Sequence, residues 1–253
     1  MIVFTPRLLR DLLEALRFLT PFSLPGATGN RNPASVIHAF PLAGLALGLV
    51  LVLVDALLDW MALPLPTRDA LLVALLVLLT GGLHLDGLMD TCDGLFGGHS
   101  PEQRLAIMRD SRVGSFGVLG GFCVLLLKVG LLGAFPGAGR VEALFIMPML
   151  GRWSMALAAV LFPSARPDGL GASFHAGATV PGLARAFLTC VLVTLAVGRG
   201  SLVALAASCC CVWLVGRLFV ARIGGLTGDS YGAVCELNEV LALFMLALAV
   251  GGT

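Results

Sequence analysis

Uncharged runs of apolar residues alternate with short polar segments along most of this chain. Seven runs have the composition of membrane-crossing helices, and the second and fifth are among the shortest. The runs lie at about residues 36–54, 69–85, 113–135, 143–162, 184–198, 200–216 and 237–252. We therefore predict an all-α, polytopic membrane bundle of about seven transmembrane helices, formed as a single domain over residues 1–253. Because very few residues separate the fifth and sixth runs, one re-entrant hairpin is the alternative there.

The chain before the first run has a different pattern. Thr5 and Pro6 are typical of a helix start, and leucines then share one face over about residues 5–19, with charged residues largely opposite. Such an amphipathic segment lies in the membrane interface and does not cross the bilayer. A second amphipathic helix is predicted to begin at Ser100 and Pro101, in the polar segment after the second run.

The composition supports the membrane assignment. Of the 253 residues, 58% are hydrophobic and 12% are charged, whereas soluble domains carry about 25% charged residues. The chain has too few polar side chains to cover a soluble fold of this size, so the lipid bilayer is its expected environment. A net charge of +1 argues against a nucleic-acid partner, and the seven cysteines show no metal-binding spacing.

The distribution of basic residues predicts the orientation. If the N-terminus is cytoplasmic, eleven of the sixteen Lys and Arg residues fall on that side and three fall on the other. This excess follows the positive-inside rule, and it places three polar segments in the cytoplasm, at about residues 84–112, 163–183 and 217–238. The other two basic residues, Lys128 and Arg152, lie within runs. We assign no role to Lys128, which is near enough to its helix end for the ammonium to reach the interface.

The first polar segment contains an acidic motif, H-L-D-G-L-M-D-T-C-D-G, at residues 84–94. Its carboxylates Asp86, Asp90 and Asp93 follow helical spacing and fall within about 40° of one another on one helix face. Adjacent carboxylates favour a bound cation, and all-oxygen ligands are typical of Mg²⁺. The motif therefore predicts a magnesium site; a solvated acidic loop is the alternative.

Glycine and histidine add to this motif. Gly87 and Gly94 would let a bound phosphate or a neighbouring helix approach the backbone closely. His84 could bind the metal, orient a carboxylate or simply end the preceding span. We include all three as candidate substrate contacts.

The next segment carries an R-D-S-R unit at residues 109–112. Arg109 and Arg112 can hold phosphate oxygens, while Asp110 reaches the metal or orients an arginine. Ser111 is included as a substrate contact. An amphipathic surface helix without a catalytic role is the alternative for this segment.

A second acidic group, Asp229, Glu236 and Glu239, surrounds the start of the last run. A carboxylate next to or inside a membrane span costs free energy, so a functional role is the default interpretation. Arg152 lies near the middle of an otherwise apolar run, so we expect it to line a polar cavity and to pair with an acidic group or a substrate phosphate. A structural ion pair is the alternative for Arg152.

Carboxylates, arginines and glycines gathered at one membrane face favour metal-assisted phosphoryl transfer with Mg²⁺ as the cofactor. The chain contains no P-loop sequence, which argues against an ordinary nucleoside triphosphatase. The general base would be an Asp or Glu of these clusters, and spacing does not say which one.

Several segments resemble the signatures of the cobalamin synthase family, which are adenosylcobinamide-GDP ribazoletransferases. The closest are H-L-D-G-L-M-D-T-C-D-G at 84–94, I-M-R-D-S-R-V-G-S-F-G at 107–117 and G-L-T-G-D-S-Y-G-A at 225–233, of which the first two are specific. The segments F-L-T-P-F-S-L-P at 18–25 and F-P-L-A-G at 40–44 are also similar. The departures are limited to Met89, Cys92 and Ser115, and none of them removes a carboxylate or an arginine.

The resemblance implies a bacterial inner-membrane enzyme of the last stage of vitamin B12 assembly. It would join adenosylcobinamide-GDP to α-ribazole or α-ribazole 5′-phosphate, release GMP and use Mg²⁺. The ribazole hydroxyl would attack the phosphorus bonded to the cobinamide arm. The implied site comprises Asp86, Asp90 and Asp93 as metal ligands, Asp110 and Asp229 completing the site, Arg109 and Arg112 on phosphate, and Glu236 or Glu239 as a supporting residue or base.

Two other functions fit parts of the pattern. A CDP-alcohol phosphotransferase would share the membrane, the metal and the acidic cluster, but Met89 and Asp90 stand where its motif requires Ala and Arg. A transporter would show internal repeats or binding residues at the membrane midplane, and we find neither in the sequence. A homo-oligomer is compatible with the sequence.

Overall fold

The computed structural model describes residues 6–25 and 32–251, and in these residues it is built from helices without a β-strand. A lone bridge joins Ser164 to Leu226. The elements are α1 (Pro6–Leu19), the 3₁₀ helix η1 (Pro33–Ala39), α2 (Phe40–Trp60), α3 (Leu65–Leu79), α4 (Leu83–Gly97), α5 (Pro101–Ile107), α6 (Ser115–Leu132), α7 (Gly137–Leu161), α8 (Leu170–Gly177), α9 (Val180–Val197), α10 (Arg199–Ile223) and α11 (Gly228–Gly251).

The predicted all-α membrane bundle is confirmed. Six helical segments are long and apolar enough to cross a membrane, namely η1 with α2, and α6, α7, α9, α10 and α11. A seventh crossing results if α3 and α4, which meet at an angle of 89°, are counted as one broken span. The fifth and sixth runs form two separate helices, α9 and α10, each long and apolar enough to cross a membrane.

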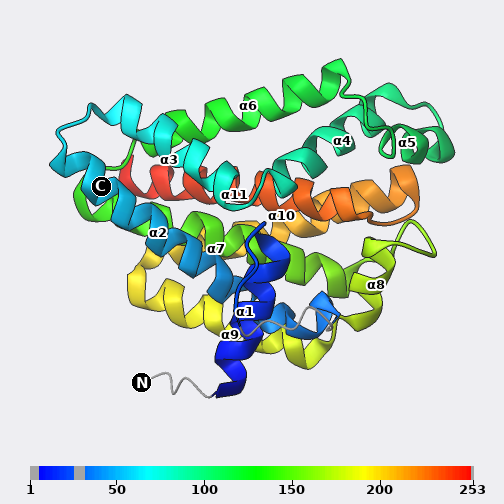
Figure 1. Cartoon of the computed structure of the whole chain (residues 1–253), viewed down its shortest axis with the longest axis horizontal. Coiled ribbons are helices and arrows are strands. Elements are labelled where there is room, and N and C mark those ends of the chain that lie inside the picture. The colour runs from blue at the N-terminus through cyan, green and yellow to red at the C-terminus, as the bar shows by residue number, and fades with distance from the viewer. Residues whose placement is uncertain (1–5, 26–31, 252–253) are drawn as a thin grey trace.

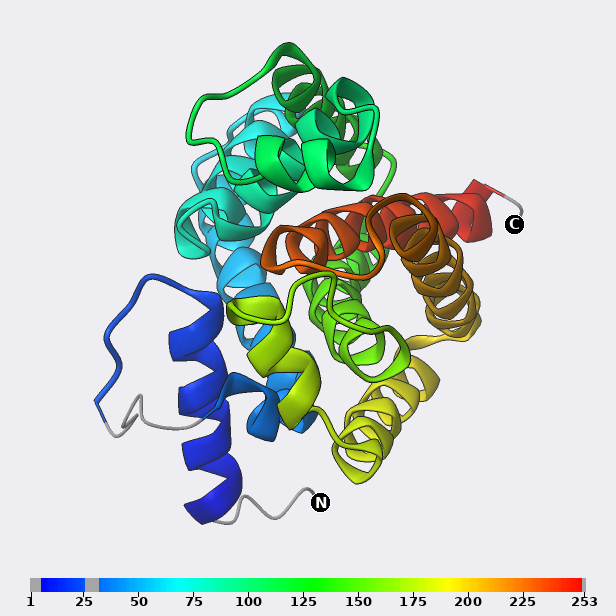
Figure 2. The same cartoon turned by 90° about the vertical axis from the view of Figure 1, so that its right-hand side faces the viewer.

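The centre of the bundle is α7. Within its apolar window 78% of the residues are buried, against 22% for α9. Figure 1 shows α11 running along the middle of the molecule, with α4 and α6 on one side and α7 and α9 on the other, and Figure 2 shows the same order end-on. The outer helices keep large apolar side chains on their outward faces, including Phe122 and Leu192, as expected for surfaces that contact lipid.

The break between α3 and α4 has a local cause. The Thr80 hydroxyl donates to the carbonyl oxygen of Leu76, and Gly81 and Gly82 then adopt positive φ values of 60° and 71°. Such left-handed residues end a helix, and glycine adopts them without a steric cost. The second predicted run, 69–85, is therefore divided, and the acidic motif lies on a helix of its own.

The last predicted run begins earlier than the sequence indicated. Helix α11 starts at Gly228 and not near residue 237, and it continues without interruption past Gly232. Asp229, Glu236 and Glu239 therefore all belong to one helix. Their separation along that helix sets different depths for the three carboxylates.

Ion pairs connect α2, α3 and α7 at one end of the bundle, and the polar sequence motifs lie at the other end. Arg140 at the start of α7 contacts Asp55 of α2 through Nε at 2.9 Å and Asp69 of α3 through Nη2 at 2.7 Å. Arg68 of α3 contacts Asp55 at 2.9 Å and also pairs with Asp59. Asp55, Arg68, Asp69 and Arg140 are buried, whereas Asp59 is exposed, and together these paired charges join α2, α3 and α7.

The motif-bearing segments gather at the other end. In Figure 1 the α4–α5–α6 region, α8 and the turn before α11 all lie at the right-hand end, and Figure 2 looks onto that end. Helix α1 lies across the long helices in Figure 1, in keeping with its predicted place in the membrane interface. The fold thus brings the three polar segments of the sequence to one side.

Candidate functional site

A backbone contact between α4 and α11 positions the site. A Cβ atom added to Gly87 would lie 2.7 Å from the carbonyl oxygen of Asp229, and one added to Gly232 would lie 2.8 Å from the carbonyl oxygen of His84. Two glycines, one on each helix, therefore allow an approach that any side chain would prevent. This contact places Asp86 on α4 beside Asp229 on α11.

A cavity of about 280 Å³ opens next to this contact. Its lining includes acidic, basic and aromatic side chains drawn from α1, α4, α7, α8, α11 and the connecting segments. The polar lining residues are His84, Asp86, Arg109, Ser164, Arg166, Asp168, Thr227, Asp229 and Tyr231, and the larger apolar ones are Phe18, Leu83, Met155 and Phe174. A concave, mainly apolar pocket with a few converging polar groups is typical of a ligand site.

Four aspartates lie close together at the acidic side of this cavity. The carboxylate of Asp90 is within electrostatic range of those of Asp86, Asp93 and Asp229. In residues 6–25 and 32–251, neither Asp86 nor Asp90 forms an ion pair with a basic side chain. Unbalanced carboxylates at this spacing repel one another, so the arrangement fits the binding of a cation.

Asp93 is engaged differently from the other three. Its Oδ2 accepts a hydrogen bond of 2.7 Å from the Gly114 amide and its Oδ1 accepts one of 2.8 Å from the Gly117 amide. These amides belong to the N-terminus of α6, where a carboxylate also interacts favourably with the helix dipole. Asp93 therefore anchors α6 to α4 through the oxygens that the sequence analysis reserved for a metal.

No group of three or more His, Cys, Asp and Glu side chains in the described part of the chain is arranged to hold a metal ion by itself. The magnesium site therefore stays a prediction. The donor set of Asp86, Asp90 and Asp229 suits a hard cation that completes its coordination with water and substrate phosphate, as Mg²⁺ commonly does.

Of the R-D-S-R unit at residues 109–112, only Arg109 lines the cavity. Arg109 lines the cavity and its Nη2 is 4.0 Å from a carboxylate oxygen of Asp168. Arg112 does not line the cavity; its Nη2 donates to Asp110 at 2.6 Å and its Nε donates at 3.0 Å. Hydrogen bonds from Arg112 lower the pKa of the Asp110 carboxyl to about 2. Ser111 is exposed and outside the cavity lining.

Arg166 is a cavity residue that the sequence analysis did not select. Its Nη2 donates to the carbonyl oxygen of Leu105 at 3.0 Å, and its Nε is buried without a partner in the described residues. Burial and the neighbouring Arg109 lower the pKa of the Arg166 guanidinium. Two arginines, from segments 57 residues apart in the sequence, thus line the same cavity as Asp86 and Asp229.

Two buried polar groups at the cavity also lack partners among the described residues. Both ring nitrogens of His84 and the hydroxyl of Tyr231 make no hydrogen bond there. Buried polar groups are nearly always satisfied in folded proteins, so these atoms are available to a ligand. Phe174 stacks on Phe18 and meets the ring of Tyr231 edge-on, which fixes an aromatic wall beside them.

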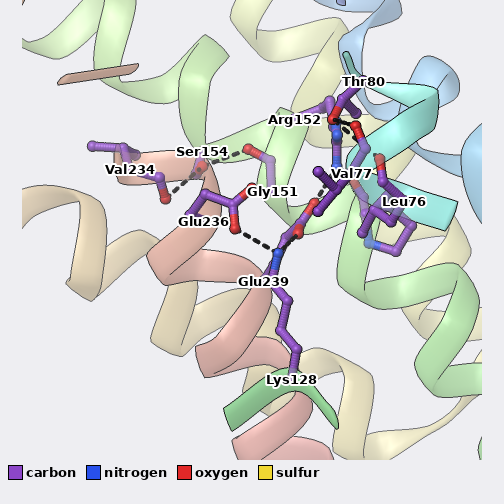
Figure 3. Close-up of polar contacts among 11 residues, drawn as sticks. Leu76, Val77, Thr80, Lys128, Gly151, Arg152, Ser154, Val234, Glu236 and Glu239 are labelled. Carbon is purple, nitrogen blue, oxygen red and sulfur yellow. Dashed lines mark hydrogen bonds and ion pairs between the residues drawn. The ribbon is translucent and has the colours of Figure 1, made fainter. Parts of the chain in front are cut away.

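The other predicted charged residues lie in a separate buried cluster (Figure 3). Lys128 of α6 donates to Glu236 of α11 at 2.6 Å and to Glu239, and Arg152 of α7 also pairs with Glu239. None of the four lines the cavity. The expectation that the Lys128 ammonium reaches the interface is wrong, because the side chain is 2% exposed and turns inward to α11.

The glycines of the acidic motif serve helix packing. Gly87 lines the cavity but is held against α11 as described, whereas Gly94 contacts α5, where an added Cβ would lie 2.9 Å from the carbonyl oxygen of Arg104. Gly94 is not part of the cavity lining. The sequence alone could not separate a glycine needed by a phosphate from one needed by a helix.

Comparison with known proteins identifies related sequences over most of the chain. The profile of a family described as cobalamin-5-phosphate synthase matches residues 11–247. A protein of Roseiflexus sp. is 42% identical over 242 residues, which cover 93% of this chain and 88% of the relative. A protein of Geotalea daltonii is 42% identical over 248 residues, covering 97% and 99%, and one of Pseudomonas paraeruginosa is 40% identical over 244 residues, covering 95% and 98%. All three relatives are named adenosylcobinamide-GDP ribazoletransferase, and no solved structure matches the fold.

Proposed function

This chain belongs to the cobalamin-5-phosphate synthase family, and from that premise we propose that it transfers the adenosylcobinamide-phosphate group to α-ribazole or α-ribazole 5′-phosphate. The donor is adenosylcobinamide-GDP and the product released is GMP. The protein is a multi-pass membrane transferase of late vitamin B12 synthesis. We place it in the bacterial inner membrane with the N-terminus and the cavity facing the cytoplasm, on the basis of its basic residues.

One observation carries the proposal: two aspartates that form no ion pair within the described residues line the same cavity as two arginines. A diphosphate needs both kinds of group, because its oxygens bind arginine directly and bind carboxylates only through a cation. Asp86 and Asp229 line one part of the cavity, with Asp90 close behind, and Arg109 and Arg166 line another. Mg²⁺, when bound there, would neutralise charge on the diphosphate and on the departing GMP.

The remaining residues have distinct roles in this proposal. Arg109 and Arg166 hold phosphate oxygens, and His84 and Tyr231 offer hydrogen bonds to an uncharged part of a substrate. A carboxylate of the Asp86, Asp90 and Asp229 group accepts the proton of the attacking hydroxyl.

Four other predicted residues support the site without touching the substrate. Asp93 fixes α6 and Asp110 fixes Arg112. Glu236 and Glu239 form buried ion pairs and do not line the cavity, so in this proposal they hold α11 in place and the base is one of the cavity aspartates.

GMP release tests the proposal directly. Purified protein in lipid nanodiscs is supplied with adenosylcobinamide-GDP, α-ribazole and Mg²⁺, and GMP is measured by chromatography. We expect release that requires all three components and falls at least 100-fold in Asp90→Asn, with Asp59→Asn at the opposite end as the matched control. Absence of GMP from the folded wild-type protein would refute the function, and normal Mg²⁺-dependent release by Asp90→Asn would refute the metal assignment.

A further inference from the structure

A second groove lies between the interfacial helix and the bundle. It has a volume of about 500 Å³ and runs between α1, the η1–α2 segment and α9. Its lining shares no residue with the reaction cavity. The lining residues divide into a polar group, Arg7, Asp11, His38, Arg185 and Thr189, and an apolar group, Leu8, Leu42, Leu45, Leu188, Leu192 and Val193.

The polar part of the groove carries two arginines. Arg7 of α1 and Arg185 of α9 are both exposed, and Arg185 uses only its Nε in a hydrogen bond of 3.3 Å to the carbonyl oxygen of Pro181. Guanidinium groups from two helices on one groove match an anionic phosphate, which accepts several N–H bonds at once. Asp11 offsets part of this charge but is directed to His38.

His38 adds a second, independent feature. Its Nε2 is 3.1 Å from a carboxylate oxygen of Asp11, and its Nδ1 is buried without a hydrogen-bond partner in the described residues. The side chain is only 8% exposed and lines the groove. In the neutral ring, Nε2–H donates to the carboxylate, so Nδ1 is an acceptor that lacks a donor. A hydroxyl group on the ligand would supply this donor.

The apolar part of the groove follows two membrane-spanning helices. Leu42 and Leu45 of α2 face Leu188 and Leu192 of α9 across it. Helices α1 and α9 both line this groove, and an interfacial helix such as α1 is expected to lie at the level of the lipid head groups. A ligand that fills this groove therefore has an anionic, hydroxyl-bearing head at the interface and an apolar tail along the bundle.

We propose that the groove binds one anionic phospholipid whose head group carries a hydroxyl, of the phosphatidylglycerol type. The phosphate contacts Arg7 and Arg185, a head-group hydroxyl donates to Nδ1 of His38, and an acyl chain lies between α2 and α9. Such a lipid joins α1 to the spans. Because Phe18 at the end of α1 lines the reaction cavity, the lipid also supports one wall of that cavity.

Native mass spectrometry of the detergent-solubilised protein tests this site without reference to the enzyme's activity. The protein is titrated with phosphatidylglycerol, phosphatidylmethanol and phosphatidylcholine of identical acyl chains. We expect one phosphatidylglycerol to bind at least tenfold more tightly than phosphatidylcholine, with phosphatidylmethanol between them because it has the same single negative charge without a head-group hydroxyl. The double variant Arg7→Gln/Arg185→Gln should lose the preference for anionic lipid.

Two single variants sharpen the test. Arg10→Gln removes the same charge from the same helix at an exposed position outside the groove, and it should bind phosphatidylglycerol as the wild type does. His38→Phe should bring phosphatidylglycerol and phosphatidylmethanol to equal affinity while both remain tighter than phosphatidylcholine. Equal binding of all three lipids by the wild type, or an equal loss in Arg10→Gln and the double variant, would overturn the proposal.

Discussion

Replacement of Lys128 by methionine tests the buried charge cluster most directly. Lys128, Arg152, Glu236 and Glu239 form a balanced set of two cations and two carboxylates, each no more than 5% exposed. Lys128→Met keeps the apolar volume but leaves Glu236 without its hydrogen-bond partner and the cluster with one excess negative charge. Breaking a buried ion pair by removing one member costs about 3–5 kcal/mol, because the remaining charge is uncompensated.

That cost converts into a measurable change in melting temperature. For a chain of this length, about 1 kcal/mol shifts the midpoint by roughly 2–4 °C, so Lys128→Met should melt roughly 6–20 °C below the wild type. A thiol-reactive fluorophore in detergent provides the assay, because Cys190 and Cys235 are buried and unpaired and become reactive on unfolding. Arg199→Met, which removes an exposed cation at the start of α10, serves as the control and should melt with the wild type.

A charge-balanced double variant separates charge from packing. In Lys128→Met/Glu236→Gln the cluster again holds equal numbers of positive and negative groups, so more than half of the lost melting temperature should return. A single variant that melts within 2 °C of the wild type would refute the role of the cluster. A double variant that melts below the single one would show that loss of packing, and not unbalanced charge, causes the effect.

Three further predictions concern the site and its supports. Gly117→Ala should destabilise the protein by about 1–3 kcal/mol, because the new Cβ would lie 2.4 Å from Oδ2 of Asp93; melting against Gly130→Ala, where the space is open, checks it. Tyr231→Phe should leave melting unchanged but raise KM for one substrate about 2- to 10-fold, since the hydroxyl makes no hydrogen bond within the described residues and is proposed to bond to a substrate. The pKa of Asp110 is lowered to about 2, so its contribution to stability is complete above about pH 4 and is lost as the pH falls toward 2. Plots of melting temperature against pH for the wild type and Asp110→Asn should therefore be parallel between pH 6 and 8.

The class of fold was predictable because the bilayer imposes it. Runs of apolar residues of sufficient length have few alternatives to a spanning helix, since backbone groups in lipid must be satisfied within the segment. The bend between α3 and α4 was harder to predict, although Gly81 and Gly82 were visible in the sequence. Two adjacent glycines permit a left-handed turn but do not require one. The early start of α11 was missed because Gly232 weakens the sequence pattern of a continuous helix, whereas in the structure it is the point where another helix makes contact.

The sequence predicted which kinds of residue form the candidate site, but it did not predict which contacts each of them makes. Helical spacing correctly grouped Asp86 and Asp90 on one helix, and the resemblance added Asp229 from a distant segment. Spacing could not show that Asp93 is turned toward the amides of α6, because that depends on where α6 packs. Arg166 was passed over since it lies in a glycine-rich loop with no recognisable period.

The division between paired and unpaired charges explains how one helix can serve both stability and chemistry. Helix α11 carries Asp229 next to the cavity, and Glu236 and Glu239 lie seven and ten residues further along. The deeper carboxylates are neutralised by lysine and arginine, which fixes the rotation and depth of α11. With the helix held there and at the Gly87 contact, the carboxylate of Asp229 can stay without a basic partner of its own and remain directed at the cavity. In the proposed reaction, a cation can then bind Asp86 and Asp229 without first displacing a basic side chain of the described residues from either carboxylate.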